Sequence, residues 1–201
     1  MAHVIKNHTL FPTVISEFEY IADKHLIDAI QNEDLIDNKV FYHSRASKDN
    51  KLHKKNTFKP LVDKILETTK EICQSYNYEY KSLEITNLWI NISQEGDCHS
   101  PHNHSNNIFS GVWYPFESKY PTPIMFHDPR PSQAHFAPKG KINEYTTTVM
   151  SYPNRKNRGF VFPSWLMHHV PPSVGTRVSI SWNIIIRGEY GEPNTLQNAS
   201  I

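Results

Sequence analysis

The chain has 201 residues, of which 38% are hydrophobic and 12% aromatic, and its formal net charge at pH 7 is +1. This composition is typical of a single folded domain and excludes a disordered chain. The near-zero net charge gives no nucleic-acid signal. No apolar run approaches the roughly 18 residues that a membrane span needs.

Two features bear on where the protein resides. The first residues, MAHVIKNHTLFPTV, lack the apolar core of a signal peptide. Cys73 and Cys98 are the only cysteines, too few for a disulfide framework or a cysteine-based zinc site. We therefore expect a soluble cytoplasmic protein, located in the host cytoplasm if a phage encodes it. A homodimer is compatible with this composition.

Two helices are predicted in the first eighty residues. Residues 16–32 have apolar side chains at helical spacing, and Ser16 and Glu19 would form a capping box at the start. Residues 60–76 give a second amphipathic helix that begins with a proline. Between them, the lysine-rich segment RASKDNKLHKKN is expected to be a solvated loop, with a mobile lid or a phosphate-contacting loop as the alternative.

From residue 81 the pattern changes to short strands rich in β-branched and aromatic residues. The strand segments are LEITNLWINIS, IFSGVWYPF, PIMFHD, EYTTTVMSY, GFVFPS and RVSISWNIII. Two helices followed by six or more strands indicate one α+β domain over residues 1–201. Its jelly-roll core, a double-stranded β-helix, spans residues 81–187 and is supported by the helical residues 1–80. Residues 129–143 are expected to be a long surface excursion and residues 188–201 a loosely held tail.

The last predicted strand has one apolar and one polar face. Alternation places Val178, Ile180, Trp182 and Ile184 on the apolar face, and Arg177, Ser179, Ser181 and Asn183 on the polar face. An arginine held on a strand can bind a carboxylate through paired charge-assisted hydrogen bonds, with the hydroxyl of Ser179 as a further donor. The alternative is a surface arginine on an edge strand.

Three histidines have the spacing of a metal site. His102 and His104, in HSPHNHSNN, share one face of an extended segment because side chains alternate with period two. His168, in FPSWLMHHV, precedes Arg177 by nine residues and a turn, so the two are expected on neighbouring strands. An H-x-H pair with one distant histidine is typical of an open three-ligand metal site, although a lone H-x-H would more simply be an exposed turn.

The order H-x-H, SGVWY, FPSWLMH and RVSISWN resembles the iron(II)- and 2-oxoglutarate-dependent oxygenases. It is most similar to a branch of small, mostly uncharacterised bacterial and phage proteins with the pattern H-x-H…SGVYY…DPR…FPSWLxH…RISxxxN. LFPT near the start and HDPR at 127–130 are also similar, so the resemblance covers nearly the whole chain. It implies a dioxygenase that uses iron(II) and 2-oxoglutarate, releases succinate and CO₂, and hydroxylates a small-molecule or peptidyl substrate.

The resemblance also implies roles for individual residues. His102 and His168 match iron ligands. Arg177, assisted by Ser179, matches the residue that binds the far carboxylate of 2-oxoglutarate. Two further cosubstrate-binding residues are Tyr114, in SGVWY, and Asn91, in LWINIS; Trp89, on the face of Asn91, is expected to be a core tryptophan.

His104 departs from the superfamily pattern because it stands where most members have a carboxylate. Three neutral imidazoles leave iron(II) with its full double charge, which the doubly charged 2-oxoglutarate would still neutralise. Such a triad would also accept nickel, copper or zinc. Halogenating relatives carry a small residue at this position, so the bulk of His104 argues against halogenation.

The remaining polar residues near these motifs have open assignments. Asp97 is the alternative to His104 as third ligand, or else a turn residue. His169 competes with His168 because neighbours on an extended segment point in opposite directions, and the family register favours His168. His99 is expected to be exposed or to lie behind the metal ligands.

The segment after residue 126 holds two further histidines and a charged pair. His127 and His135 are expected at the surface, with an approach of His127 to the site as the alternative. Asp128 and Arg130 would form a turn or line the substrate mouth.

Two other functions remain open. GDCHSPHNH fits the start of a cupin metal site, but the glutamate expected a few residues later is replaced by Ile108 and Phe109. A non-catalytic jelly-roll binding module is the other alternative.

Overall fold

The computed structural model describes residues 6, 8, 10–38, 43–130, 140–141, 143–192 and 194–201. Its helices are α1 (Lys24–Gln31) and α2 (Lys59–Ser75), with short 3₁₀ turns η1 (Leu52–Lys54) and η2 (Asn56–Phe58). Its strands are β1 (Ser16–Glu19), β2 (Leu35–Asn38), β3 (Ser44–Ser47), β4 (Ser82–Ser93), β5 (His99–His102), β6 (Phe109–Trp113), β7 (Ile124–His127), β8 (Val149–Tyr152), β9 (Arg158–Pro163), β10 (His168–Val170), β11 (Arg177–Arg187), β12 (Glu189–Tyr190) and β13 (Ala199–Ser200). Within these ranges, no helix has both the length and the apolar character needed to cross a bilayer.

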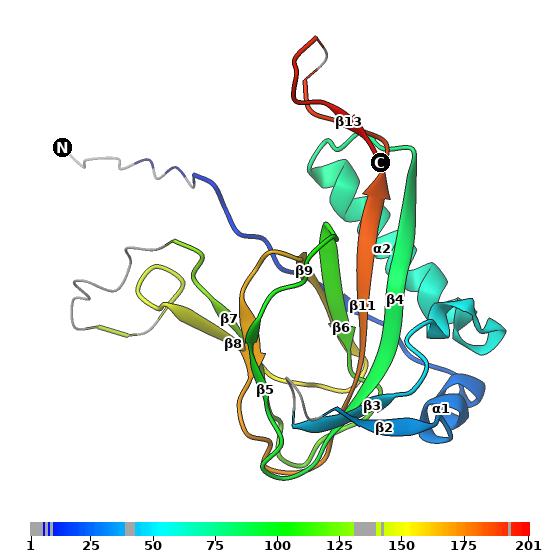
Figure 1. The fold of residues 1–201 in the computed structure, drawn as a ribbon. Coiled ribbons are helices and arrows are strands. Elements are labelled where there is room, and N and C mark those ends of the chain that lie inside the picture. Colours follow the sequence, from blue (N-terminus) through cyan, green and yellow to red (C-terminus); the bar gives the residue numbers. More distant parts are fainter. Residues whose placement is uncertain are drawn as a thin grey trace.

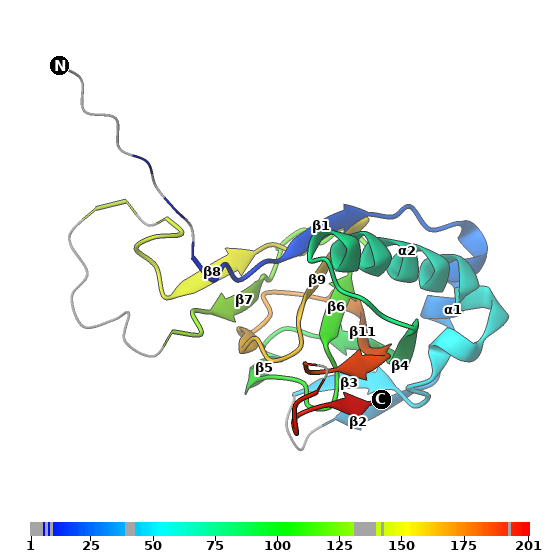
Figure 2. The same cartoon turned by 90° about the horizontal axis from the view of Figure 1, so that it is seen from above.

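All strands except β12 and β13, which pair with each other, form two facing antiparallel sheets. The larger sheet has the order β1-β9-β6-β11-β4-β3-β2, and the smaller has the order β5-β10-β7-β8. Figure 1 shows α1 and α2 on one side of β6, β11 and β4, and the smaller sheet on the other side. Seen from above, α2 runs beside the larger sheet, away from β5 (Figure 2). The predicted α+β fold with a jelly-roll core and two supporting helices is confirmed.

The helices cover the apolar face of β11, which alternates as predicted. Ile180, Trp182 and Ile184 have no exposed surface and pack in one cluster with Leu61 and Ile65 of α2. Burial of such side chains, each contributing roughly 1.5–3 kcal/mol, holds β11 in place. The opposite face of β11 is therefore turned toward the smaller sheet.

The predicted capping box at Ser16 and Glu19 is wrong. These residues form β1, which pairs with β9 and buries Phe18 against Trp182 and over Gly159. The first helix begins later, where the Asp23 side chain accepts a 2.8 Å hydrogen bond from the Leu26 N–H. The second predicted helix is confirmed by α2, with a proline in its first turn.

The lysine-rich segment after β2 is not a simple solvated loop. Its first residues belong to β3, which pairs with β4 and places Ala46 opposite Asn91. Farther along, the Leu52 side chain is fully buried in the helix-covered core. The apolar side chains of this segment, Ala46 and Leu52, are buried and fix its path, while its lysines are exposed.

The structure describes most of the predicted tail at 188–201 but little of the predicted excursion at 129–143. The tail is partly ordered, because β12 pairs with β13. Most of the predicted excursion at 129–143, including His135, lies outside the described residues.

Candidate metal and cosubstrate site

A pocket of about 400 Å³ lies between the two sheets. One wall is the polar face of β11 and the adjacent face of β4, and the other wall comes from β5, β10 and β7. All four polar residues predicted for one face of β11, namely Arg177, Ser179, Ser181 and Asn183, line this pocket. The polar face predicted from alternation is thus the floor of an interior site.

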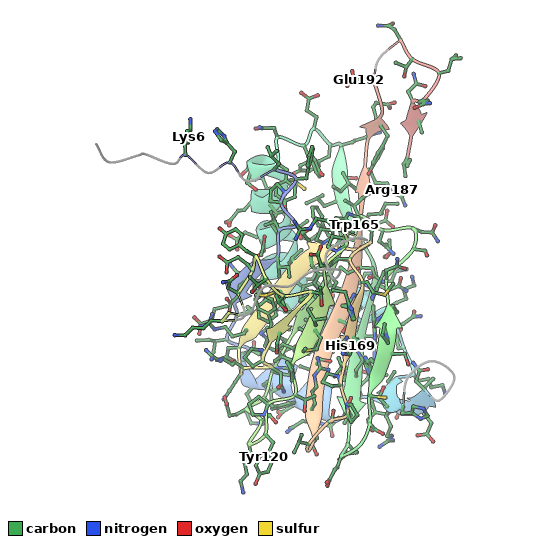
Figure 3. The ribbon with its side chains drawn as sticks, turned by 90° about the vertical axis from the view of Figure 1, so that its left-hand side faces the viewer. Lys6, Tyr120, Trp165, His169, Arg187 and Glu192 are labelled. Carbon is green, nitrogen blue, oxygen red and sulfur yellow. The ribbon has the colours of Figure 1, made fainter. Side chains whose placement is uncertain are left out.

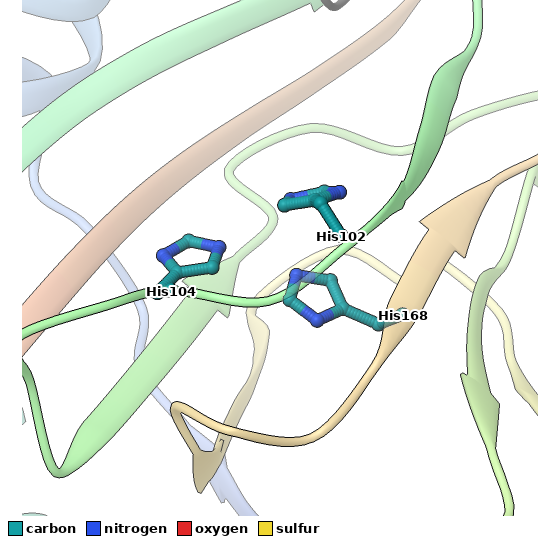
Figure 4. Close-up of side chains that lie close together, drawn as sticks. All are labelled: His102, His104 and His168. Carbon is teal, nitrogen blue, oxygen red and sulfur yellow. The ribbon is translucent and has the colours of Figure 1, made fainter.

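His102, His104 and His168 converge in this pocket (Figure 4). His102 lies directly opposite His168 in the pairing of β5 with β10, and His104 follows β5 by two residues. Each histidine offers one ring nitrogen, and these nitrogens all lie within 4.8 Å of one another. The three histidines with metal-ligand spacing are therefore brought together, each from an extended segment.

The same ring nitrogen is engaged in all three histidines. Nδ1 of His102 lies 2.7 Å from the backbone oxygen of Ser100. Nδ1 of His104 lies 2.6 Å from the side-chain oxygen of Asn183. Nδ1 of His168 lies 2.8 Å from the backbone oxygen of Leu166. A carbonyl oxygen only accepts, so each Nδ1 carries the hydrogen and donates it. The lone pair of each neutral ring is then on Nε2. In His104, Nε2 is buried without a hydrogen-bond partner among the described residues.

Burial keeps these imidazoles neutral. Desolvation lowers the pKa of His168 to about 3 and that of His102 to about 4, and it also lowers the pKa of His104. A metal binds the unprotonated ring, so the three side chains are in their ligating form at neutral pH. Oriented neutral nitrogens of this kind fit a divalent transition metal such as iron(II), and equally nickel, copper or zinc.

Arg177 is a buried cation at the other end of the same pocket. Its side chain donates from Nη1 to Ser179 Oγ at 3.1 Å and from Nη2 to Tyr114 Oη at 3.0 Å. The residue is only 2% exposed, and its Nε has no hydrogen-bond partner in the described part of the chain. No described carboxylate forms an ion pair with it. Because a buried unpaired charge is strongly unfavourable, this guanidinium calls for an anionic ligand.

Two buried hydroxyl groups lie beside Arg177, one from a predicted residue and one from a residue that was not predicted. Tyr114 is fully buried, and this burial raises the pKa of its phenol, which stays protonated. Ser93, which sequence reasoning missed, lies opposite Arg177 in the β4–β11 register, and its buried Oγ has no described partner. Both residues lie beside Arg177, although neither is among the residues that line the pocket.

Asn91 and Trp89 lie together on the pocket floor. The Asn91 amide accepts from Trp89 Nε1 at 3.2 Å and donates to Ser181 Oγ at 3.1 Å. The prediction that Trp89 is a core residue is wrong, because it is only half-buried and lines the pocket. Its indole stands beside the His104 ring, with 28° between the planes.

His99 was expected to be exposed or to lie behind the metal ligands. It is not one of the three converging histidines, but it does line the pocket. Strict alternation would turn His99 away from His102. The β5–β10 register shifts between these residues: His102 faces His168, whereas His99 faces Val170. The extra residue of this bulge brings both histidines to one face. Burial and the nearby Arg177 lower the pKa of His99 to about 3.

The remaining candidates are outside the pocket. The Asp97 carboxylate accepts a 2.7 Å hydrogen bond from the Gln94 N–H, as a turn residue does. His169 follows His168 on β10, so alternation turns its side chain to the other face, and its Nδ1 lies 2.8 Å from His127 Nε2. Figure 3 shows the position of His169 in the view with the left-hand side of Figure 1 toward the reader. Asp128 and Arg130 form a turn with a two-pronged ion pair, as predicted.

One prediction of strand placement needs correction. His168 and Arg177 lie on consecutive strands, β10 and β11, but these strands belong to different sheets rather than neighbouring positions in one sheet. The turn between them crosses from one wall of the pocket to the other. The two residues therefore line the same pocket from opposing walls.

Residues 87–183 match a family model described as "Putative 2OG-Fe(II) oxygenase". No curated protein matches the sequence. A Pseudomonas putida prolyl-4-hydroxylase structure is similar with a TM-score of 0.62 at 11% identity, over 88% of this chain and 94% of that chain. The epimerase SnoN from nogalamycin biosynthesis, described as non-heme and alpha-ketoglutarate dependent, has a TM-score of 0.60 at 10% identity, over 92% and 81% of the two chains. A Trichoplax adhaerens prolyl hydroxylase bound to a hypoxia inducible factor peptide has a TM-score of 0.59 at 10% identity, over 84% and 82%.

At these identities the solved structures show the fold. The family match covers the stretch from β4 to β11 that holds the three histidines and Arg177. The chain therefore has the fold of these oxygenases, and its segment 87–183, which contains the three converging histidines and Arg177, is similar to the family described as "Putative 2OG-Fe(II) oxygenase".

Proposed function

We propose that the protein is a non-haem iron(II)- and 2-oxoglutarate-dependent dioxygenase that hydroxylates a C–H bond of its substrate. One observation carries this proposal: the buried Arg177, without a described carboxylate partner, shares a pocket with three neutral histidines. A metal-binding jelly roll that did not use an acidic cosubstrate would have no need for this cation.

The histidines would hold the metal through Nε2. Their Nδ1 hydrogen bonds fix the orientation of each ring, as hydrogen bonds behind metal ligands commonly do. When bound, iron(II) and 2-oxoglutarate supply oxygen activation coupled to release of succinate and CO₂. Three protein ligands leave open positions for that chemistry.

Arg177 would bind the far carboxylate of 2-oxoglutarate, with Ser179 and Tyr114 beside it. The guanidinium is held by these two hydroxyl oxygens before any ligand binds, so little reorganisation is needed. Asn91 would act beside them at the cosubstrate. The hydrogen bonds of its amide to Trp89 and Ser181 hold it in the pocket floor.

An anaerobic titration tests this proposal. The metal-free protein, loaded with iron(II), should develop the weak visible absorbance of an iron(II)–2-oxoglutarate chelate when 2-oxoglutarate is added. Arg177→Ala should lose this response at the same cosubstrate concentration. Arg187→Ala is the matched control, because Arg187 lies on the same strand and pairs with Glu84 at the surface.

Each result has a distinct meaning. Metal binding without a response to 2-oxoglutarate would favour a cupin-like metal protein. Absence of specific metal binding would favour a non-catalytic binding module. A gain of 16 mass units in a substrate, formed together with succinate, would identify the reaction as hydroxylation.

A further inference from the structure

The pocket extends beyond the metal ligands to a second polar region. The β4–β11 register runs from Arg177 opposite Ser93 to Asn183 opposite Asn87, so Asn87 marks the end of the pocket away from the arginine. Asn50 lies beside this end, because its backbone oxygen accepts a hydrogen bond from the Leu88 N–H. Four lining residues belong to this region: Lys48, Asn50, Asn87 and Trp89.

Lys48 is the cation of this region. Its side chain is exposed and lines the pocket. Lys48 follows Ala46 by two residues, and Ala46 lies opposite Asn91 of β4. Among the described residues, Lys48 forms no ion pair. The adjacent acidic side chain, Asp49, is engaged elsewhere: it accepts a 2.7 Å hydrogen bond from the Lys51 N–H and lies 3.6 Å from Lys55 Nζ. No Asp or Glu is among the described residues that line the pocket.

The charges in the pocket do not balance without a further anion. Two carboxylates of 2-oxoglutarate would offset the double charge of the metal, because His102, His104 and His168 contribute none. Arg177 and Lys48 then remain as two positive charges. Had a carboxylate stood at position 104, it would have offset one of them. In a pocket partly shielded from water, such an excess attracts an anion over several ångströms.

We infer that the substrate of this site is a small polar molecule or side chain that carries a carboxylate or a phosphate, and that this group pairs with Lys48. The inference rests on the proposed function. The amides of Asn50 and Asn87 offer donors and acceptors for the polar remainder of such a substrate. The half-buried indole of Trp89 gives it a flat apolar wall between this region and His104.

Matched pairs of small molecules test the inference by binding rather than turnover. Protein loaded anaerobically with iron(II) and 2-oxoglutarate is titrated with glycerol 3-phosphate against glycerol, phosphoserine against serine, and N-acetylaspartate against N-acetylasparagine. The readout is the shift of the visible chelate band, which responds to a molecule placed next to the metal. Wild type is compared with Lys48→Gln, Lys48→Arg and the control Lys54→Gln, which removes an exposed lysine that does not line the pocket.

We expect at least one anionic compound to shift the band at about tenfold lower concentration than its neutral partner. This preference should be lost in Lys48→Gln, kept in Lys48→Arg and Lys54→Gln, and weakened by added salt. The inference is overturned if neutral partners bind as tightly, if Lys48→Gln behaves like Lys54→Gln, or if no anion shifts the band. Failure of the chelate band to form at all would instead overturn the proposed function.

Discussion

The Nδ1 of His104 donates a 2.6 Å hydrogen bond to the side-chain oxygen of Asn183, a residue 79 positions away on β11. The same oxygen accepts a 2.8 Å hydrogen bond from Ser110 Oγ, which lies 2.8 Å from Ser164 Oγ. Arg177 begins the strand that carries Asn183. One strand therefore positions both a candidate metal ligand and the candidate cosubstrate anchor.

Replacement of Asn183 should weaken metal binding. Asn183→Ala removes the acceptor that fixes the His104 ring, and loss of such a partner typically lowers metal affinity about 10–100-fold. Asn183→Asp keeps an acceptor and should bind metal more tightly than Asn183→Ala. The measurement is competition for the metal with a chromophoric chelator. Asn87→Ala, a change to the pocket residue opposite Asn183, is the control; equal affinities of Asn183→Ala and Asn87→Ala would contradict the role of Asn183.

His104 rather than Asp97 should complete the metal site. His104→Ala removes one of three ligands and should lower metal affinity by more than the roughly 100-fold that loss of an outer hydrogen bond causes. Asp97→Asn keeps an oxygen for the Gln94 N–H and should leave the affinity unchanged. The same chelator competition measures both. A large loss in Asp97→Asn with little loss in His104→Ala would reverse the assignment.

The metal-free protein should lose stability as the pH falls below about 6.5. In the unfolded chain the histidines titrate near 6.5, whereas the folded-state pKa is about 3 for His168 and about 4 for His102. The unfolded state therefore binds more protons over this interval, so the free energy of unfolding falls from pH 6.5 toward pH 4 and is fully retained above pH 6.5. Urea unfolding at several pH values measures the slope.

Two comparisons show whether the buried histidines cause that slope. Added metal should raise the free energy of unfolding from neutral pH down to about pH 5 and lose this effect toward pH 4, where protons begin to compete for the nitrogens of the folded protein. His168→Gln should have a shallower dependence on pH than the wild type. A metal-free wild type with equal stability at pH 7 and pH 5 would contradict the neutral, buried state of these rings.

Gly111 in the SGVWY segment should be essential for packing. A Cβ at this position would lie 2.2 Å from the indole of Trp182, which is fully buried. Gly111→Ala should therefore destabilise the protein by at least about 1–3 kcal/mol, the usual cost of overpacking. Gly140→Ala is the control, since its Cβ would meet no atom within 4 Å. Thermal unfolding of both variants measures the difference, and equal melting temperatures would contradict this packing.

The features that could be predicted from the sequence depend on local periodicity. The alternation of β11 was enough to place Arg177, Ser179 and Asn183 on one face, and the period of two placed His102 with His104. The place of His99 in the pocket wall was not predicted, because a bulge in β5 changes the face on which this residue lies. A bulge leaves no clear mark in the sequence of one strand.

The errors near the N-terminus have a related cause. SEFE at 16–19 satisfies both a capping box and a short strand, and the choice is made by pairing with Val161 in β9, far along the chain. Likewise, Trp89 was assigned to the core by its residue type. Its actual position depends on which face of β4 meets the smaller sheet, a tertiary relationship that composition does not contain.

The most direct measurement is a crystal structure of the protein soaked anaerobically with iron(II) and 2-oxoglutarate. We predict one metal ion bound by Nε2 of His102, His104 and His168, with the far carboxylate of 2-oxoglutarate on Arg177. A metal bound through Asp97, or 2-oxoglutarate located away from Arg177, would contradict the proposed site.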